Sequence, residues 1–96
     1  MQTYLILWNW TEQGIRTFKE SPKRVEAFRQ VVEKHGGKMV SFFYTMGKHD
    51  GATIVELPSD EAYLKVALTL SSLGNVRTTT LKAWHYTEMA KIINQV

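Results

Sequence analysis

Two neighbouring residues that can carry a proton, His49 and Asp50, stand between two apolar runs of the sequence. An imidazole titrates near neutral pH, and a carboxylate can act as a general base or accept a hydrogen bond from a ligand. One hypothesis is therefore that these two residues are catalytic. The alternative is turn chemistry, because Gly47 supplies a positive φ and an Asp side chain can close a turn. The residues alone leave both interpretations open.

Arg77, which carries a guanidinium group, begins a second stretch of residues that could bind a ligand. This stretch is rich in threonine. The guanidinium group can hold a substrate carboxylate through two parallel hydrogen bonds, or it can pair with Asp50 or Glu56 and order the end of a sheet. The residues that we expect to contact a small organic ligand combine phenol, carboxylate, guanidinium and hydroxyl groups: Tyr4, Tyr44, Asp50, Arg77, Thr78 and Thr80.

Other patterns point to ordinary roles. Arg16, Lys19 and Arg24 flank Ser21, so an anion site is one interpretation of that cluster and a simple helix cap is the other. The three histidines lack the spacing of metal ligands, and no phosphate loop or dinucleotide fingerprint occurs, so we expect no metal and no cofactor. The basic–aromatic signature of sheet-based RNA binders is absent as well, so nucleic acid is not an expected partner.

The composition is that of an ordinary soluble protein. The chain has 96 residues, 44% of them hydrophobic and 22% charged, with a net charge of +3 and no cysteine. That length predicts one domain over residues 1–96, and the lack of cysteine excludes disulfides and thiolate metal sites. No apolar run approaches the roughly 18 residues that span a bilayer, and the N-terminus lacks the basic region of a signal peptide. We therefore expect a cytoplasmic protein with no membrane partner.

The stretch from Gly37 to Pro58 predicts a β-hairpin around which the fold is organised. Its first arm alternates, with Val40, Phe42, Tyr44 and Met46 expected on one face and Met39, Ser41, Phe43 and Thr45 on the other. Alternation of aromatic and β-branched residues, broken by glycine and aspartate, is typical of two antiparallel strands and a tight turn.

The remaining chain supplies two more strands, one short helical turn and three helices. Capping residues and glycine stops set the expected bounds of these elements. The first half has a strand at 3–8, a short turn capped by Thr11 and running to Lys19, and a helix from Ser21–Pro22 to Gly36–Gly37. The second half has a helix capped by Ser59 or Asp60 and closed by Gly74–Asn75, a strand at 76–85, and a short C-terminal helix capped by Thr87 and anchored by Ile92 and Ile93. The order βαββαβ predicts an α+β, ferredoxin-like fold with a four-stranded antiparallel sheet.

Two helices cover only one face of such a sheet. The other face must carry one of two alternating sets, either that of Tyr4, Ile6 and Trp8 with the matching residues of the last strand, or its complement. Both sets are too apolar for free solvent, so we expect a second copy to pack there. The predicted assembly is a homodimer or larger, a dimeric α/β barrel with a ligand cavity between the sheets.

Four segments carry a resemblance to a known family. They are TEQGIRTFKESPKR (11–24), YTMGKHD (44–50), ELPSDEA (56–62) and GNVRTTTLKAW (74–84). In these segments the chain resembles the GYD domain family of small bacterial and archaeal proteins, which is similar to dimeric α/β barrel proteins. The family motif is Gly-x-Tyr-Asp-like, and this chain has His49 at its aromatic position. The resemblance implies the fold and the dimer, and no settled activity.

Three functions follow as hypotheses. The first is a small-molecule-binding protein that uses the cavity between sheets. The second is a cofactor-free enzyme of the same architecture, monooxygenase- or isomerase-like, in which His49 or Asp50 carries a proton. The third is a structural subunit whose cavity is filled by its own side chains.

Overall fold

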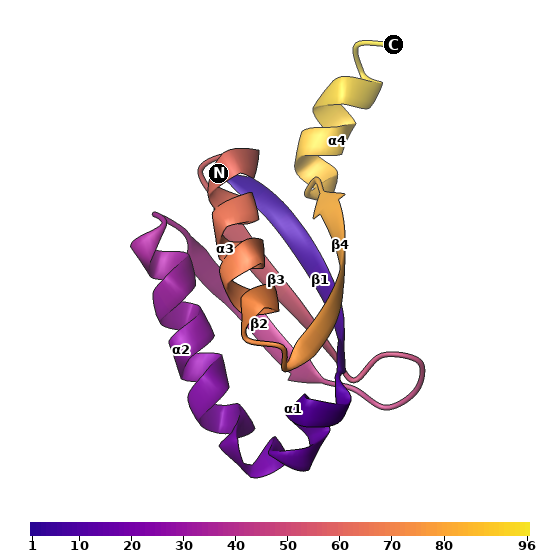
Figure 1. The fold of residues 1–96 in the computed structure, drawn as a ribbon. Helices are drawn as coiled ribbons and strands as arrows, with labels where there is room; N and C mark the ends of the chain where they lie inside the picture. The colour runs from indigo at the N-terminus through magenta and orange to yellow at the C-terminus, as the bar shows by residue number, and fades with distance from the viewer.

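The elements follow one another in the order that the sequence predicts. The computed structural model describes residues 1–96, and its elements are β1 (Gln2–Trp10), α1 (Glu12–Arg16), the 3₁₀ helix η1 (Phe18–Glu20), α2 (Ser21–Lys34), β2 (Lys38–Tyr44), β3 (Gly51–Leu57), α3 (Asp60–Ser72), β4 (Val76–Ala83) and α4 (Tyr86–Ile93). The strands form one antiparallel sheet in the order β2-β3-β1-β4 (Figure 1). The predicted α+β, ferredoxin-like fold is confirmed.

Local sequence signals set the ends of several helices. The Thr11 hydroxyl accepts a hydrogen bond from the Gly14 amide at the start of α1, and the Ser59 hydroxyl accepts one from the Ala62 amide at the start of α3. Gly36 (φ 83°) and Gly74 (φ 75°) lie just past α2 and α3 in the left-handed region, where a side chain is disfavoured. These caps and stops are the ones that the sequence predicts.

Two predicted caps are wrong. Ser21 is the first residue of α2, and its hydroxyl lies 2.7 Å from the Tyr44 hydroxyl, so it ties the helix to β2 and caps nothing. The C-terminal helix begins one residue before Thr87, and its cap is His85, whose Nδ1 accepts a hydrogen bond from the Thr87 amide. The Glu88 carboxylate accepts a hydrogen bond from the His85 amide in return and completes a capping box.

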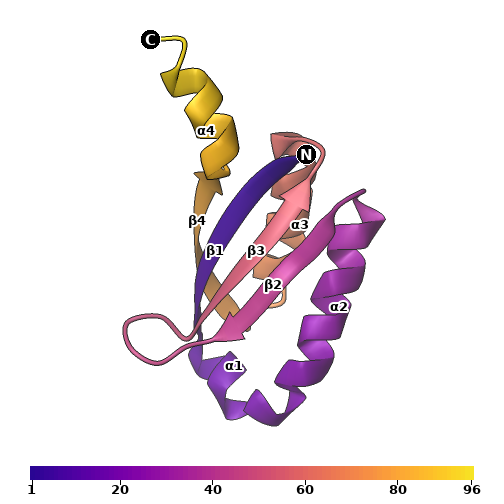
Figure 2. The ribbon, with the colours of Figure 1, turned by 180° about the vertical axis from the view of Figure 1, so that it is seen from behind.

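The core lies between the sheet and the two long helices. In Figure 1 α3 lies in front of the strands, and in Figure 2 the strands lie in front of α3, so one face of the sheet is left without helices. The buried cluster joins residues of β1, β3, α2 and α3: Tyr4, Ile6, Phe28, Val32, Val55, Leu57, Tyr63 and Val66. The set of Tyr4, Ile6 and Trp8 is therefore the covered set, and its complement faces outward.

A β-bulge changes the predicted faces of β2. Met39 pairs with Val55 and Ser41 pairs with Ile54, so Val40 is an extra residue in the ladder. Met39 consequently packs against the core. Phe42 lies opposite the buried Thr53 and so shares the covered face with Met39, although the sequence predicts opposite faces for these two residues. The alternation resumes from Ser41 onward.

The C-terminal helix stands apart from the body of the molecule. α4 continues beyond the end of β4 and projects away from the sheet (Figure 1). Ile92 and Ile93, predicted to anchor it, are 46% and 58% exposed, so within one chain they anchor nothing. No helix of the structure combines the length and the hydropathy needed to cross a bilayer.

Candidate functional site

The loop with His49 and Asp50 is fastened to the end of β1. The Asp50 carboxylate accepts a hydrogen bond from the Trp10 amide (3.0 Å), and the Asn9 side-chain amide donates to the Lys48 carbonyl (2.9 Å). His49 Nδ1 lies 3.1 Å from Asn9 Oδ1. Both candidate catalytic groups thus tie the loop to the end of β1, and the Asp50 carboxylate bonds the distant Trp10 amide where the sequence predicts a local bond that closes the turn.

Arg77 does not form the ion pair that the sequence favours. It lies opposite Asn9 on β4, it is exposed, and neither Asp50 nor Glu56 is within ion-pair distance of it. The carboxylate of Asp50 is satisfied by the backbone amide of Trp10, which explains why it needs no arginine. Arg77 remains a free cation on the side of the sheet that the helices leave open.

The other predicted ligand-binding residues lie on the covered side of the sheet. Thr78 pairs with Trp8 and Thr80 pairs with Ile6 across β1 and β4. Trp8 and Ile6 lie on the same face of β1 as Tyr4, and this is the face that the helices cover. Tyr44 faces α2, where its hydroxyl meets Ser21. These four residues and Arg77 therefore do not share a face, so a cavity between two open sheet faces would contact Arg77 without them.

Tyr4 and Thr80 instead belong to a cluster that the sequence does not reveal. The Tyr4 hydroxyl donates to the Asp60 carboxylate, and Lys82 Nζ lies 3.0 Å from that carboxylate. The Tyr4 ring stacks on Tyr63 with centroids 4.2 Å apart, and the Tyr63 hydroxyl bonds Thr80. These contacts join the start of α3 to β1 and β4.

The cluster shifts the titration of three side chains. Burial, together with the hydrogen bond to Asp60, raises the pKa of Tyr4 above its ordinary value. The hydrogen bonds from Tyr4 and Lys82 lower the pKa of Asp60. Burial also raises the pKa of Tyr63, opposed in part by its bond to Thr80. The tyrosines stay protonated and the aspartate stays ionised, so the cluster serves best as a fixed hydrogen-bond network.

The open face of the sheet is apolar at its centre. Leu5 pairs with Ile54 on one side and Leu81 on the other, and residues paired across antiparallel strands share a face. Leu7 extends the stripe along β1, and Phe43 extends it across β2 and is 57% exposed. Within one chain nothing covers this stripe.

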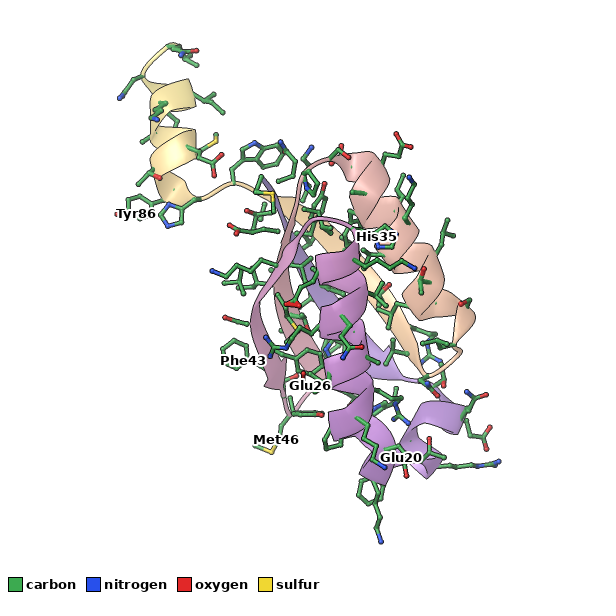
Figure 3. The ribbon with its side chains drawn as sticks, turned by 90° about the vertical axis from the view of Figure 1, so that its left-hand side faces the viewer. Glu20, Glu26, His35, Phe43, Met46 and Tyr86 are labelled. Atoms are coloured by element: carbon green, nitrogen blue, oxygen red, sulfur yellow. The ribbon has the colours of Figure 1, made fainter.

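α4 presents a second apolar surface. Tyr86, Met89 and Ile93 are spaced three and four residues apart, so they share one side of the helix, and each is at least 44% exposed. In Figure 3 α4 lies on the side of the sheet from which Phe43 projects, away from α2 and α3. The two exposed apolar surfaces therefore lie on the same side of the molecule.

The covered side contains a cavity of about 120 Å³ between the sheet and helices α2 and α3. Trp8 forms one wall, and its indole ring lies directly over Gly51, where an added Cβ would come within 2.0 Å of the ring. The cavity reaches solvent between α2 and the end of α3, where Ala27, Thr69 and Leu73 line it and are exposed.

The chain matches the GYD domain family over residues 4–93. It belongs to this family. A relative from Thermus thermophilus, named glutamine synthetase and cystathionine beta-lyase binding protein, is 30% identical over 84 residues, which are 86% of this chain and 88% of the relative. That name describes the relative as a protein that binds two enzymes.

Two solved structures are similar in fold. TTHA0845 from Thermus thermophilus aligns with 88% of this chain and 95% of its own at 23% identity, with a TM-score of 0.55. FFRP-DM1 aligns with 88% of this chain and 100% of its own at 15% identity, with a TM-score of 0.63. At these identities the structures confirm the ferredoxin-like arrangement of the GYD domain.

Sequence reasoning missed three kinds of feature in this GYD domain. The sequence marks Asp60 as a possible helix cap, but it does not reveal the hydrogen bonds of Asp60 to Tyr4 and Lys82. Those bonds join residues that are 56 and 22 positions apart. The cavity depends on how far α2 and α3 stand from the sheet, which no local pattern records. The exposed side of α4 was the one detectable feature, since Met89 and Ile93 are spaced as one helix face.

Proposed function

We propose that this GYD protein is a self-associating binding protein: two copies pair through the open faces of their sheets, and the pair binds a metabolic enzyme. The apolar stripe of the open face carries the first part of the proposal. The name of the Thermus relative supports the second part. A cytoplasmic location belongs to the same proposal.

The size of the open face argues for a second copy as its occupant. Strands of seven to nine residues, about 4.8 Å apart with a rise of about 3.3 Å per residue, give four strands a footprint of roughly 500 Å². A stable interface buries about 800 Å² on each partner. The projecting side chains add to this flat footprint, so the sheet face supplies most of that area. A second copy offers the same flat, apolar shape.

α4 can supply the rest of the interface. A helix of eight residues is too short to be stable alone in water, and the apolar side of α4 has no partner within its own chain. Because α4 lies towards the open side, it can pack on the second copy when two open faces meet (Figure 3). Such an arrangement would be the dimeric α/β barrel that the sequence predicts.

The enzyme partner is tested directly by binding. Glutamine synthetase and cystathionine β-lyase of the organism that encodes this chain are immobilised in turn, with an unrelated enzyme of similar net charge as the control. We expect saturable binding of the GYD protein to at least one of the two at up to about 10 µM, the range of weak specific complexes. Binding to neither, or equal binding to the control, would overturn the enzyme part of the proposal and leave the pairing part standing.

The sequence also predicts a ligand cavity between the paired sheets. Among the predicted ligand contacts, Arg77 alone is proposed to line such a cavity. Arg77 lies at the edge of the open face and has no carboxylate partner, so a dimer would place it beside the cavity between sheets. The proton-carrying role of His49 and Asp50 is the alternative. It predicts that His49→Phe shifts a pH–rate profile, whereas the loop-holding role predicts a change in stability only.

A further inference from the structure

The cavity beneath α2 and α3 is the right size for one aromatic ring. Its volume is about 120 Å³, and an apolar cavity of about 150 Å³ in another protein takes up benzene. Eleven of its 16 lining residues are hydrophobic, among them Ile6, Trp8, Phe28, Phe42, Val31 and Leu70. A ring placed there would be surrounded by side chains of the core and still reach solvent through the gap between the helices.

The aromatic walls of the cavity are held in place. The Trp8 ring is tilted against Phe42, with centroids 5.6 Å apart, and meets Trp10 edge-on at 5.5 Å. Aromatic rings favour these edge and offset contacts over face-to-face stacking. A flat occupant can therefore make the same contacts with walls that are already ordered.

Polar atoms inside the cavity already have partners. Trp8 Nε1 donates to the Thr53 hydroxyl at 3.3 Å, and the Ser21 hydroxyl is bonded to that of Tyr44. A polar group buried there would find few free donors or acceptors, which is costly. The buried part of an occupant must therefore be apolar.

One charged group lines the cavity, the half-buried guanidinium of Arg24. It donates to the Thr17 carbonyl (3.1 Å), the Thr17 hydroxyl (3.0 Å) and the Gly14 carbonyl (3.2 Å), all of them neutral. Arg16 and Arg29 each pair with a glutamate, whereas Arg24 has no carboxylate within 4.0 Å. Its position is fixed by hydrogen bonds while its charge is uncompensated.

We propose that this cavity binds a small aromatic carboxylate of about the size of benzoate, with the ring against Trp8 and the carboxylate on Arg24. A guanidinium recognises a carboxylate through parallel hydrogen bonds, and this one is already oriented. The site lies on the covered side of a single chain, so it is separate from the cavity between sheets and does not depend on pairing or on an enzyme partner.

The test compares benzoate with benzamide, its uncharged near-isostere. Tryptophan fluorescence follows both titrations in a Trp84→Phe background, in which only Trp8 and Trp10 report. Arg24→Gln removes the charge, and Arg29→Gln is the matched control because Arg29 lies on the same helix but does not line the cavity. Val31→Phe fills the cavity; if it does not fold, Ala27→Phe at the exposed rim takes its place.

We expect benzoate to bind saturably with a Kd below about 1 mM, which is reasonable for so small a ligand. Arg24→Gln should weaken benzoate about tenfold to a hundredfold, the usual effect of losing a charged hydrogen-bond partner, and change benzamide less than about twofold. Arg29→Gln should change neither, and the filling variant should abolish both. No saturable binding of benzoate, equal losses in the two glutamine variants, or binding that survives the filling variant would each overturn the proposal.

Discussion

Replacing Phe43 with alanine should weaken pairing of the GYD protein through the open face of its sheet. Phe43 is 57% exposed in the single chain. A phenylalanine presents roughly 200 Å² when fully exposed, so about 110 Å² remains to be covered by a partner. At about 25 cal/mol per Å², that is about 2.7 kcal/mol on each copy.

The two-fold symmetry of a pair doubles the effect of this substitution. Alanine retains part of the contact, and area converts incompletely into affinity, so we expect a loss of about 3 kcal/mol per dimer. That corresponds to a dimer dissociation constant roughly a hundredfold larger. Sedimentation equilibrium over a series of concentrations measures this constant directly for the original and the substituted protein.

Phe18 provides the matched control for Phe43. It is 53% exposed on the 3₁₀ helix η1, which is not part of the open face. Phe18→Ala should leave the dissociation constant within about twofold, a difference of less than about 0.5 kcal/mol. If both variants weaken pairing equally, or if neither does, then Phe43 is not at the interface and the reasoning from the open face fails.

Three further predictions concern the folded chain. Gly51→Ala should lower the free energy of unfolding by about 1–3 kcal/mol through overpacking against Trp8, and urea unfolding should show it; a loss below about 0.5 kcal/mol would contradict the close approach of the ring. Asp60 has a lowered pKa, so it stabilises the fold above its unfolded pKa near 3.9 and loses this effect as the pH falls. Tyr4 has a raised pKa, so it stabilises the fold below about pH 10 and loses this effect as the pH rises further. Tyr4→Phe should therefore flatten the decline of unfolding free energy on both sides, and unchanged slopes near about pH 3 and about pH 10.5 would count against the network. Asp50→Ala should free the loop from the Trp10 amide and cost about 1 kcal/mol, or roughly 4–8 °C in melting temperature, with faster amide exchange over residues 45–50; unchanged exchange there would argue against the loop-holding role.

Local signals predicted most of the fold because each depends on a few neighbouring residues. Thr11 and Ser59 cap their helices through the next turn, and Gly36 and Gly74 end helices through their own backbone conformation. The element order then leaves few ways to build an antiparallel sheet. These features were therefore within reach of the sequence.

Contacts between distant residues were out of reach. The bulge at Val40 depends on how β2 and β3 pair, and the sequence of β2 alone favours regular alternation. The sequence predicts Tyr4 as a ligand contact, but in the folded chain its hydroxyl bonds Asp60 at the start of α3. The ligand contacts predicted on β1 and β4 depend on which face of the sheet the helices cover, and the sequence does not show that face.

Pairing through the open face is tested by finding which leucine and isoleucine methyl groups contact a second copy. A mixture of isotope-labelled and unlabelled chains gives nuclear Overhauser effects that arise only between molecules. Pairing of the sheets predicts such effects from the methyl groups of Leu5, Leu7 and Ile54, on the open face of the sheet. Intermolecular effects only from Leu64 and Leu68, which are exposed on α3, or none at all, would contradict it.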